Sequence, residues 1–385
     1  MVAPADLALG LSTTDARFVV AIVATRLLVR LAIPRAPLVI VVALVIDAAD
    51  ETLLAALTDV DTTETGSYQS VDKALDIYYL SIAYLATMRN WTSNSAFRIA
   101  QFLFYYRLVG VVLFELTDTR LMLLLFPNTF EFFFIAYELV RLRFEPSRFS
   151  ARAWVLTGAG LWVFVKLPQE YWIHVAKLDF TDTVRDYPAF GIAVVLALLV
   201  AAFLLVRFVL PRIPAPDWPW RLAADRLPAS LTELHARYAR RLESGRVFTS
   251  DAFEQICLLG LICVVFASIL PEVDATVLQV VLGVAAVVVA NAAISLAAAR
   301  RGGFGPTSAA ARYAALLATN VVLIYFGHAL LADRRTFELD VGLFFGFLIT
   351  TLIWLYDAFR PVHDHRFAPP VRRGEAAGSG TMRPP

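Results

Sequence analysis

Five carboxylates stand at helical spacing near the start of the chain, in sequence otherwise apolar enough to cross a membrane. Asp47, Asp50 and Glu51 are three and four residues apart, so they share one face of a helix. Asp72 and Asp76 are four residues apart and begin the next apolar stretch. In a helical hairpin these side chains converge near one membrane surface, where they can bind a divalent cation such as Mg²⁺ or Ca²⁺ or carry protons. We expect a cation- or proton-binding site here; the alternative is that only Asp47 is buried and the others cap helix ends in water.

The order of these aspartates resembles the motif DxxDGxxARx8GxxxDxxxD of the CDP-alcohol phosphatidyltransferases. The matching segments are DAAD at 47–50 and DKALD at 72–76. The resemblance implies metal-bound aspartates and phosphodiester transfer to an alcohol. The sequence departs from the motif because Glu51 replaces its first glycine and Leu54 and Ala55 replace its Ala-Arg pair. The gap between the two halves is also longer, so we do not assign the chain to this family.

A second set of charges lies inside apolar stretches of the first half. Its members are Arg98, Arg107, Glu115, Glu131 and Glu138. Charged side chains at bilayer depth are costly and are usually paired, or else mark a substrate pathway. The set predicts either Arg–Glu pairs that hold the bundle together or a polar cavity whose arginines bind an anionic group. The spacing of Arg98, Gln101 and Tyr105 places these three on one helix face.

A third group lies in the segment 167–186, which we expect to form a loop outside the membrane. Its candidate residues are Glu170, Trp172, His174 and Asp179. A histidine flanked by carboxylates is compatible with acid–base chemistry. The alternative is an interfacial aromatic belt, where tryptophan and tyrosine are enriched.

The composition sets the class of protein. Of 385 residues, 59% are hydrophobic and 17% are charged, whereas a soluble domain is about 45–50% apolar and about 25% charged. The sequence therefore predicts an all-α, polytopic integral membrane helix bundle. A net charge of +1 gives no basis for nucleic-acid binding. Arginine greatly outnumbers lysine, a bias common in GC-rich bacterial genomes, so we expect a bacterial cell membrane.

Ten or eleven transmembrane helices are expected, because about 20 apolar residues are needed for each. The candidate spans are 18–33, 37–57, 72–88, 97–117, 121–140, 152–166, 187–209, 252–270, 276–299, 311–331 and 341–360. The first is short and could lie in the interface instead. Pro127-Asn128 predicts a kink or re-entrant turn within 121–140. The segment after 152–166 could dip back into the bilayer.

Arginine-rich loops predict the orientation. They place the linker 210–250, the loop 141–152, the loop 300–312 and the C-terminus in the cytoplasm. The expected parts are an N-terminal membrane half with buried charges (1–186), an apolar C-terminal half that includes the linker (187–360), and a disordered tail (361–385). Residues 231–246 predict a basic amphipathic helix that contacts anionic lipid or a protein partner.

The chain has none of the motifs GxxxxGK[ST], HExxH or GxSxG, which excludes a recognisable ATP-binding P-loop, zinc protease or serine hydrolase. The lone Asn320 is expected to make a helix–helix hydrogen bond. Three functions stay open. The first is a secondary transporter with a cation or proton at Asp47, Asp50 and Glu51 and its substrate near Arg107. The second is a metal-dependent enzyme for lipid-linked substrates, and the third is a non-catalytic assembly protein that uses 231–246.

Overall fold

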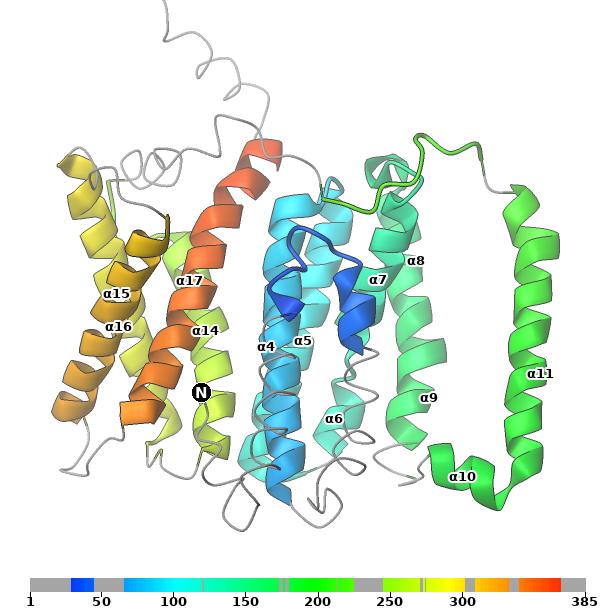
Figure 1. Ribbon diagram of the computed structural model, residues 1–385, viewed down its shortest axis with the longest axis horizontal. Coiled ribbons are helices and arrows are strands. Elements are labelled where there is room, and N and C mark those ends of the chain that lie inside the picture. The colour runs from blue at the N-terminus through cyan, green and yellow to red at the C-terminus, as the bar shows by residue number, and fades with distance from the viewer. Residues whose placement is uncertain are drawn as a thin grey trace, which may run out of the picture.

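The computed structural model is a bundle of membrane-length helices (Figure 1). It describes residues 29–44, 66–119, 121–172, 176, 180–212, 214–224, 245–270, 273, 275–301, 309–331 and 339–367. The helices are α4 (Gly66–Asn90), α5 (Asn94–Thr117), α6 (Leu121–Leu125), α7 (Thr129–Arg141), η1 (Pro146–Arg148), α8 (Ala151–Leu161), η2 (Trp162–Lys166), α9 (Leu167–Glu170), α10 (Phe180–Asp186), α11 (Pro188–Leu204), η4 (Leu205–Val209), η5 (Leu210–Arg212), α14 (Ser250–Ile269), α15 (Val277–Arg300), α16 (Ala309–Leu331) and α17 (Leu339–Phe367).

Seven segments of the described chain are helices long and apolar enough to cross a membrane. They are Asn94–Thr117, Leu121–Arg141, Pro188–Phe208, Ser250–Ile269, Val277–Ala297, Ala310–Ala329 and Val341–Phe367. The described residues form no strand. The predicted all-α, multi-pass membrane bundle is therefore confirmed.

Hydroxyl side chains set the start of several of these helices. Ser93 accepts a hydrogen bond from the Ala96 amide at the start of α5 (3.4 Å), and Thr249 accepts one from the Ala252 amide at the start of α14 (3.2 Å). Such caps satisfy backbone donors that have no partner within the helix. They fix where each span begins.

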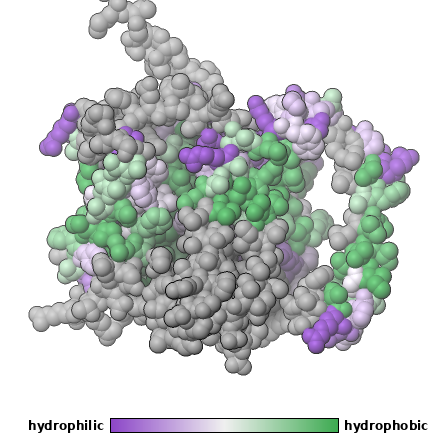
Figure 2. Space-filling model, viewed as in Figure 1, coloured by the Kyte–Doolittle hydropathy of each residue, from purple (hydrophilic) through white to green (hydrophobic). Residues whose placement is uncertain are grey.

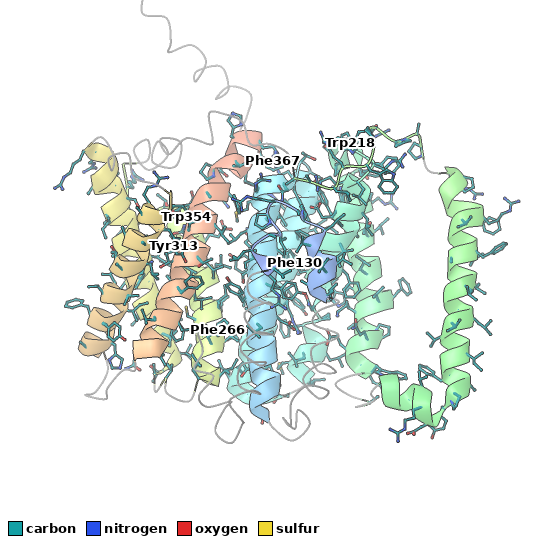
Figure 3. All side chains as sticks on the ribbon, viewed as in Figure 1. Phe130, Trp218, Phe266, Tyr313, Trp354 and Phe367 are labelled. Carbon is teal, nitrogen blue, oxygen red and sulfur yellow. The ribbon has the colours of Figure 1, made fainter. Side chains whose placement is uncertain are left out.

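The core forms around α4, which packs against α5, α14 and α17. Ile82, Ala83, Tyr84 and Leu85 are successive residues of α4 and none is exposed to solvent. A helix that is buried on every side must be surrounded by other helices. Aromatic side chains fill the interior of the bundle. One of these is Phe130 of α7, which is fully buried (Figure 3). One core thus joins described helices from both predicted halves; the boundary at 186 stays a prediction.

α11, in contrast to α4, is exposed over most of its surface. It stands away from the other helices (Figure 1), and its most apolar 18-residue window has no buried residue. Large apolar side chains such as Val195, Leu199 and Phe203 are more than half exposed, and the helix surface is almost uniformly hydrophobic (Figure 2). In a membrane this surface contacts lipid.

The arginine-rich segments gather at one end of the bundle. The linker is fixed to the loop after α7, because the Asp217 amide donates to the Arg143 carbonyl (2.9 Å). The end of α17 reaches the same region, where Arg366 donates to the Trp91 carbonyl (2.6 Å). Thr92 in turn donates to Glu145 (2.6 Å), in the loop after α7. The linker, the loop after α7 and the end of α17 therefore lie at the same end of the bundle, as the predicted topology requires. The assignment of that end to the cytoplasm stays a prediction.

Three helices are joined by a ladder of polar side chains. Asn291 of α15 donates to Asn320 of α16 (2.6 Å), and Asn320 donates to Thr350 of α17 (2.8 Å). Asn320 and Thr350 are fully buried. The predicted helix–helix hydrogen bond of Asn320 is confirmed.

The expectation of a loop after residue 166 is wrong. The chain stays helical from α8 through η2 and α9 to Trp172. Within η2 the Leu167 amide donates to the Trp162 carbonyl, five residues earlier, which makes the turn a π-helix. This wide turn accommodates Pro168, whose ring would otherwise clash with the preceding turn.

Candidate functional site

Part of the predicted acidic site lies outside the described residues. The residues concerned are Asp47, Asp50 and Glu51, together with His174 and Asp179 of the third group. Asp76 is half-buried in α4, and Asp72 lies in the same helix. The part of the chain that the structure describes contains no group of three or more His, Cys, Asp or Glu residues suited to a metal ion. The carboxylate cluster therefore stays a prediction.

Glu138, one of the predicted charges, forms a buried ion pair at the end of α7 with Arg141, which was not among the candidates. Arg141 Nε lies 2.6 Å from Glu138 Oε2, and both side chains are almost fully buried. Trp91 Nε1 donates to the other carboxylate oxygen (3.0 Å), and its ring stacks on Tyr137 at 3.8 Å between centroids. The pair is held by neighbouring side chains and fixes the end of α7 against the loop before α5.

The span Leu121–Arg141 is interrupted at Phe126–Asn128, between α6 and α7. Pro127 has no amide hydrogen, so the helix cannot continue through it unbroken. The carbonyls freed by the break are bound by side chains of α5. Tyr106 donates to the Leu125 carbonyl (2.8 Å), and Arg107 donates to the Phe126 carbonyl (3.0 Å). The kink predicted from Pro127-Asn128 is therefore confirmed as a broken helix.

Charged side chains from α7 and from the η2–α9 segment meet at this break. Lys166 Nζ lies 3.4 Å from Glu170 Oε1, and both side chains are buried. The Asn128 amide donates to Glu170 Oε1 (3.4 Å), and Asn128 Nδ2 donates to Glu131 Oε2 (2.8 Å). Glu131 is also buried, with 4% of its surface exposed. Glu170, expected in an external loop, is instead a buried helical residue, and Trp172 is the half-buried residue that ends this helical stretch.

Several buried polar atoms at the break have no hydrogen-bond partner among the described residues. Arg107 Nε, Asn128 Oδ1 and Thr129 Oγ1 are among them. Thr129 is 1% exposed. A buried polar group of this kind is rare in native proteins and calls for an explanation, such as an ion or water that it binds. We call the six residues together the break site: Arg107, Asn128, Thr129, Glu131, Lys166 and Glu170.

A second polar centre, which sequence reasoning missed, surrounds Glu254 near the start of α14. Tyr84 of α4 (2.7 Å) and Gln101 of α5 (3.2 Å) donate to Glu254 Oε1. Tyr356 (3.0 Å) and Arg360 (2.6 Å), both of α17, donate to Glu254 Oε2. One carboxylate therefore joins four helices. We call these five residues the Glu254 clasp.

The clasp continues toward the end of the bundle. Arg360 also pairs with Asp364 (3.3 Å) and Asp251 (3.5 Å). The sequence shows these charges only as single residues near the ends of separate apolar stretches. Two spacings could have pointed to the cluster: Asp251 and Glu254 are three residues apart, and Tyr356, Arg360 and Asp364 follow one another at intervals of four, so each set shares a helix face.

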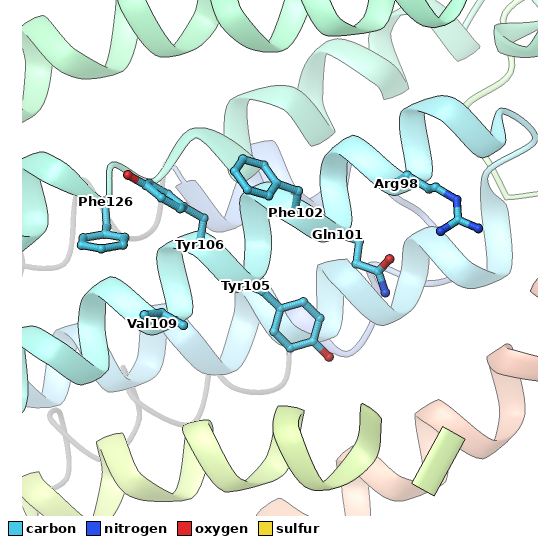
Figure 4. A pocket seen from close by; sticks show the side chains of 7 residues that line it. All are labelled: Arg98, Gln101, Phe102, Tyr105, Tyr106, Val109 and Phe126. Carbon is cyan, nitrogen blue, oxygen red and sulfur yellow. The ribbon is translucent and has the colours of Figure 1, made fainter. Parts of the chain in front are cut away.

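Of the remaining predicted charges, Glu115 is half-buried near the end of α5 and Arg98 is exposed near its start. Arg98 lies at one end of a groove along α5, with a volume of about 450 Å³ (Figure 4). The lining residues are Arg98, Gln101, Phe102, Tyr105, Tyr106, Val109 and Phe126. The groove therefore extends from Gln101 of the Glu254 clasp to Phe126 beside the break site. The shared face predicted for Arg98, Gln101 and Tyr105 lines this groove.

Comparison with models of protein families, with curated proteins and with solved structures finds no match to this chain. The function is therefore argued from the geometry of the break site, the Glu254 clasp and the groove.

Proposed function

We propose that this multi-pass membrane protein is a secondary transporter of the permease kind, in which the break site takes up a proton or a small cation. The observation that carries the proposal is the broken span between α6 and α7, with buried carboxylates beside it. Irregular backbone at membrane depth is tolerated where it is buried in protein or lines a cavity. In secondary transporters, broken helices of this type provide the groups that bind substrate and coupling ions.

The charge balance of the break site would change when it takes up one ion. Glu131 and Glu170 supply two negative charges, and Arg107 and Lys166 supply two positive ones, when all four are ionised. Uptake of one proton or monovalent cation changes this balance by one unit. A proton on Glu170 would weaken its ion pair with Lys166 and release the hydrogen bond to the Asn128 backbone. Binding at the carboxylates would thereby alter how α7 and α9 are held together.

The oxygen ligands also suit a small hard cation. Carboxylate, amide and hydroxyl oxygens are the ligands that such cations prefer. Asn128 Oδ1 and Thr129 Oγ1 have no hydrogen-bond partner among the described residues. Asn128 bonds to both the Glu131 and Glu170 carboxylates through its nitrogens, and Thr129 is the next residue in the chain. A proton would bind to a carboxylate alone, whereas a metal cation would also use the Thr129 hydroxyl as a ligand.

The Glu254 clasp is a weaker candidate for the coupling site. Its carboxylate already accepts four hydrogen bonds, one of them from Arg360, which favours a fixed anion that holds helices together. The enzyme hypothesis depends on Asp47, Asp50, Asp72 and Asp76, and the assembly hypothesis depends on residues 231–246. Because Asp47, Asp50 and residues 231–244 lie outside the described residues, no described contact favours either hypothesis. From the arginine-rich end we further propose a bacterial cytoplasmic membrane with a cytoplasmic C-terminus.

The test uses proteoliposomes adsorbed on a solid-supported membrane, with rapid jumps in proton, Na⁺ or K⁺ concentration. Wild-type protein should give a charge displacement for at least one of these ions, and E170Q should lose it. D186N is the matched control, because Asp186 is an exposed carboxylate on α10 outside the break site. Its signal should equal that of the wild type.

Folding of the variants must be separated from their activity. Replacing both members of a buried ion pair by apolar residues is often neutral for stability, whereas removing one is costly. K166M/E170L should therefore fold and still give no signal. Wild-type protein that responds to none of the three ions, or E170Q that responds like the wild type, would refute the proposal.

A further inference from the structure

We infer that the groove along α5 binds one anionic phospholipid, with its phosphate on Arg98 and an acyl chain along Phe102, Tyr106 and Val109. This inference concerns binding alone and does not depend on transport. It rests on the unpaired charge of Arg98, on the apolar groove next to it, and on the position of both within a membrane span.

Arg98 differs from Arg107 and Arg141, the other two arginines described above on α5 and α7. Arg107 donates to a backbone carbonyl and Arg141 pairs with Glu138. Arg98 is exposed and has no hydrogen bond or ion pair with any described residue. An arginine near a membrane surface extends its charged end toward the headgroups. The guanidinium group binds phosphate through two parallel hydrogen bonds.

The depth of Arg98 matches that of a lipid phosphate. α5 begins at Asn94 and is long and apolar enough to span a membrane. Arg98 is four residues into the helix, which is about 6 Å at 1.5 Å per residue. The positive end of the helix dipole at the start of α5 adds to the attraction for an anion. The groove therefore presents its positive charge where phosphates of a bilayer lie.

Apart from Gln101, the rest of the groove is lined by aromatic and aliphatic side chains and faces outward. Phe102 is 57% exposed and Val109 is 38% exposed, on the same side of α5 as Arg98 (Figure 4). From Arg98 to Val109 the helix rises about 16 Å, a length that an extended acyl chain can follow. Phe126 closes the far end. Positive charge at one end and apolar walls along the remainder complement an anionic lipid rather than a free anion or a soluble polar molecule.

The experiment measures lipids bound to the purified full chain by native mass spectrometry, after exchange into nanodiscs of equal phosphatidylglycerol and phosphatidylcholine. The wild type should retain one phosphatidylglycerol in preference to phosphatidylcholine. R98Q should lower this preference about fivefold, the factor that corresponds to about 1 kcal/mol for one basic side chain at an anionic surface. R152Q is the matched control, because Arg152 is exposed in the first turn of α8 and lies outside the groove.

A second variant tests the acyl chain. V109W adds bulk to the exposed face of α5 without entering the core, so it should reduce retention of both lipids. Phosphatidylglycerol bound to V109W as tightly as to the wild type would mean that only the phosphate is recognised, and would overturn the inference. An unchanged preference in R98Q, an equal loss in R152Q, or a dimer that covers the groove would also overturn it.

Discussion

Removing the central carboxylate of the Glu254 clasp should destabilise the bundle, because four donors lose their acceptor at once. In E254A, Tyr84 and Tyr356 keep hydroxyls that are buried, with the residues 0% and 1% exposed. Hydrogen bonds between membrane helices contribute about 0.6 kcal/mol each on average, so four bonds give about 2 kcal/mol. Each hydroxyl left unsatisfied adds about 1 kcal/mol. We expect a loss of about 2 to 4 kcal/mol in the free energy of unfolding.

The matched control removes a charge from the edge of the same cluster. Asp251 lies 3.5 Å from Arg360 and its side chain is 31% exposed. Exposed ion pairs contribute about 0–1 kcal/mol, so D251N should cost less than about 1 kcal/mol. Both variants are compared with the wild type by reversible unfolding in mixed micelles, in which the fraction of dodecyl sulfate is increased and helix content is followed by circular dichroism.

The two results together test the reasoning. If E254A is no less stable than D251N, the four hydrogen bonds at Glu254 do not hold the helices together. E254Q adds a further check, because its amide can still accept from Tyr84 but presents a donor to Arg360. Its stability should lie between those of the wild type and E254A.

Three further predictions concern other parts of the bundle. A Cβ atom at Gly110 would lie 2.1 Å from Phe126 Cβ, so G110A should cost about 1–3 kcal/mol in the same unfolding titration. The hydrogen bond from Arg148 lowers the pKa of Asp217. The Arg148–Asp217 contact should therefore be intact above the pKa of a free aspartate, about 3.9. It should be lost as the pH falls through the lower pKa that Asp217 has in the folded protein. Limited proteolysis of the linker across this range should show the loss, and D217N should remove the pH dependence. N320L breaks two buried hydrogen bonds and should cost about 1 kcal/mol, measured as for G110A.

Features fixed by local sequence could be predicted. The membrane class follows from apolar runs long enough to span, and the break in α6–α7 follows from Pro127, which lacks an amide hydrogen. The helical continuation to Trp172 was not predicted. The π-turn of η2 accommodates Pro168, and no local sequence pattern specifies such a turn.

The sites that join distant helices could not be predicted. Glu254 is separated from Tyr84 by 170 positions and from Arg360 by 106. Each is a single polar residue in its own stretch, and no spacing rule links residues on different helices. The break site was predicted in part. Arg107 and Glu131 were candidates in one group, Glu170 was a candidate in a separate external loop, and Lys166 was not a candidate.

Whether water reaches Thr129 distinguishes a coupling site from a buried structural cluster. A transporter must expose its coupling site to water, whereas a purely structural ion pair need not. We would replace Cys257 and Cys263 by serine, introduce T129C, and measure its reaction with a small charged thiol reagent in proteoliposomes. The control is T87C, since Thr87 is fully buried in α4 and bonds only to its own helix.

T129C should react measurably, at a rate that changes with the pH or with the cation found in the ion-jump measurements. T87C should not react. A T129C side chain as unreactive as T87C under every ion condition would contradict the account, and the charges at the break would then serve only to hold α7 against α9.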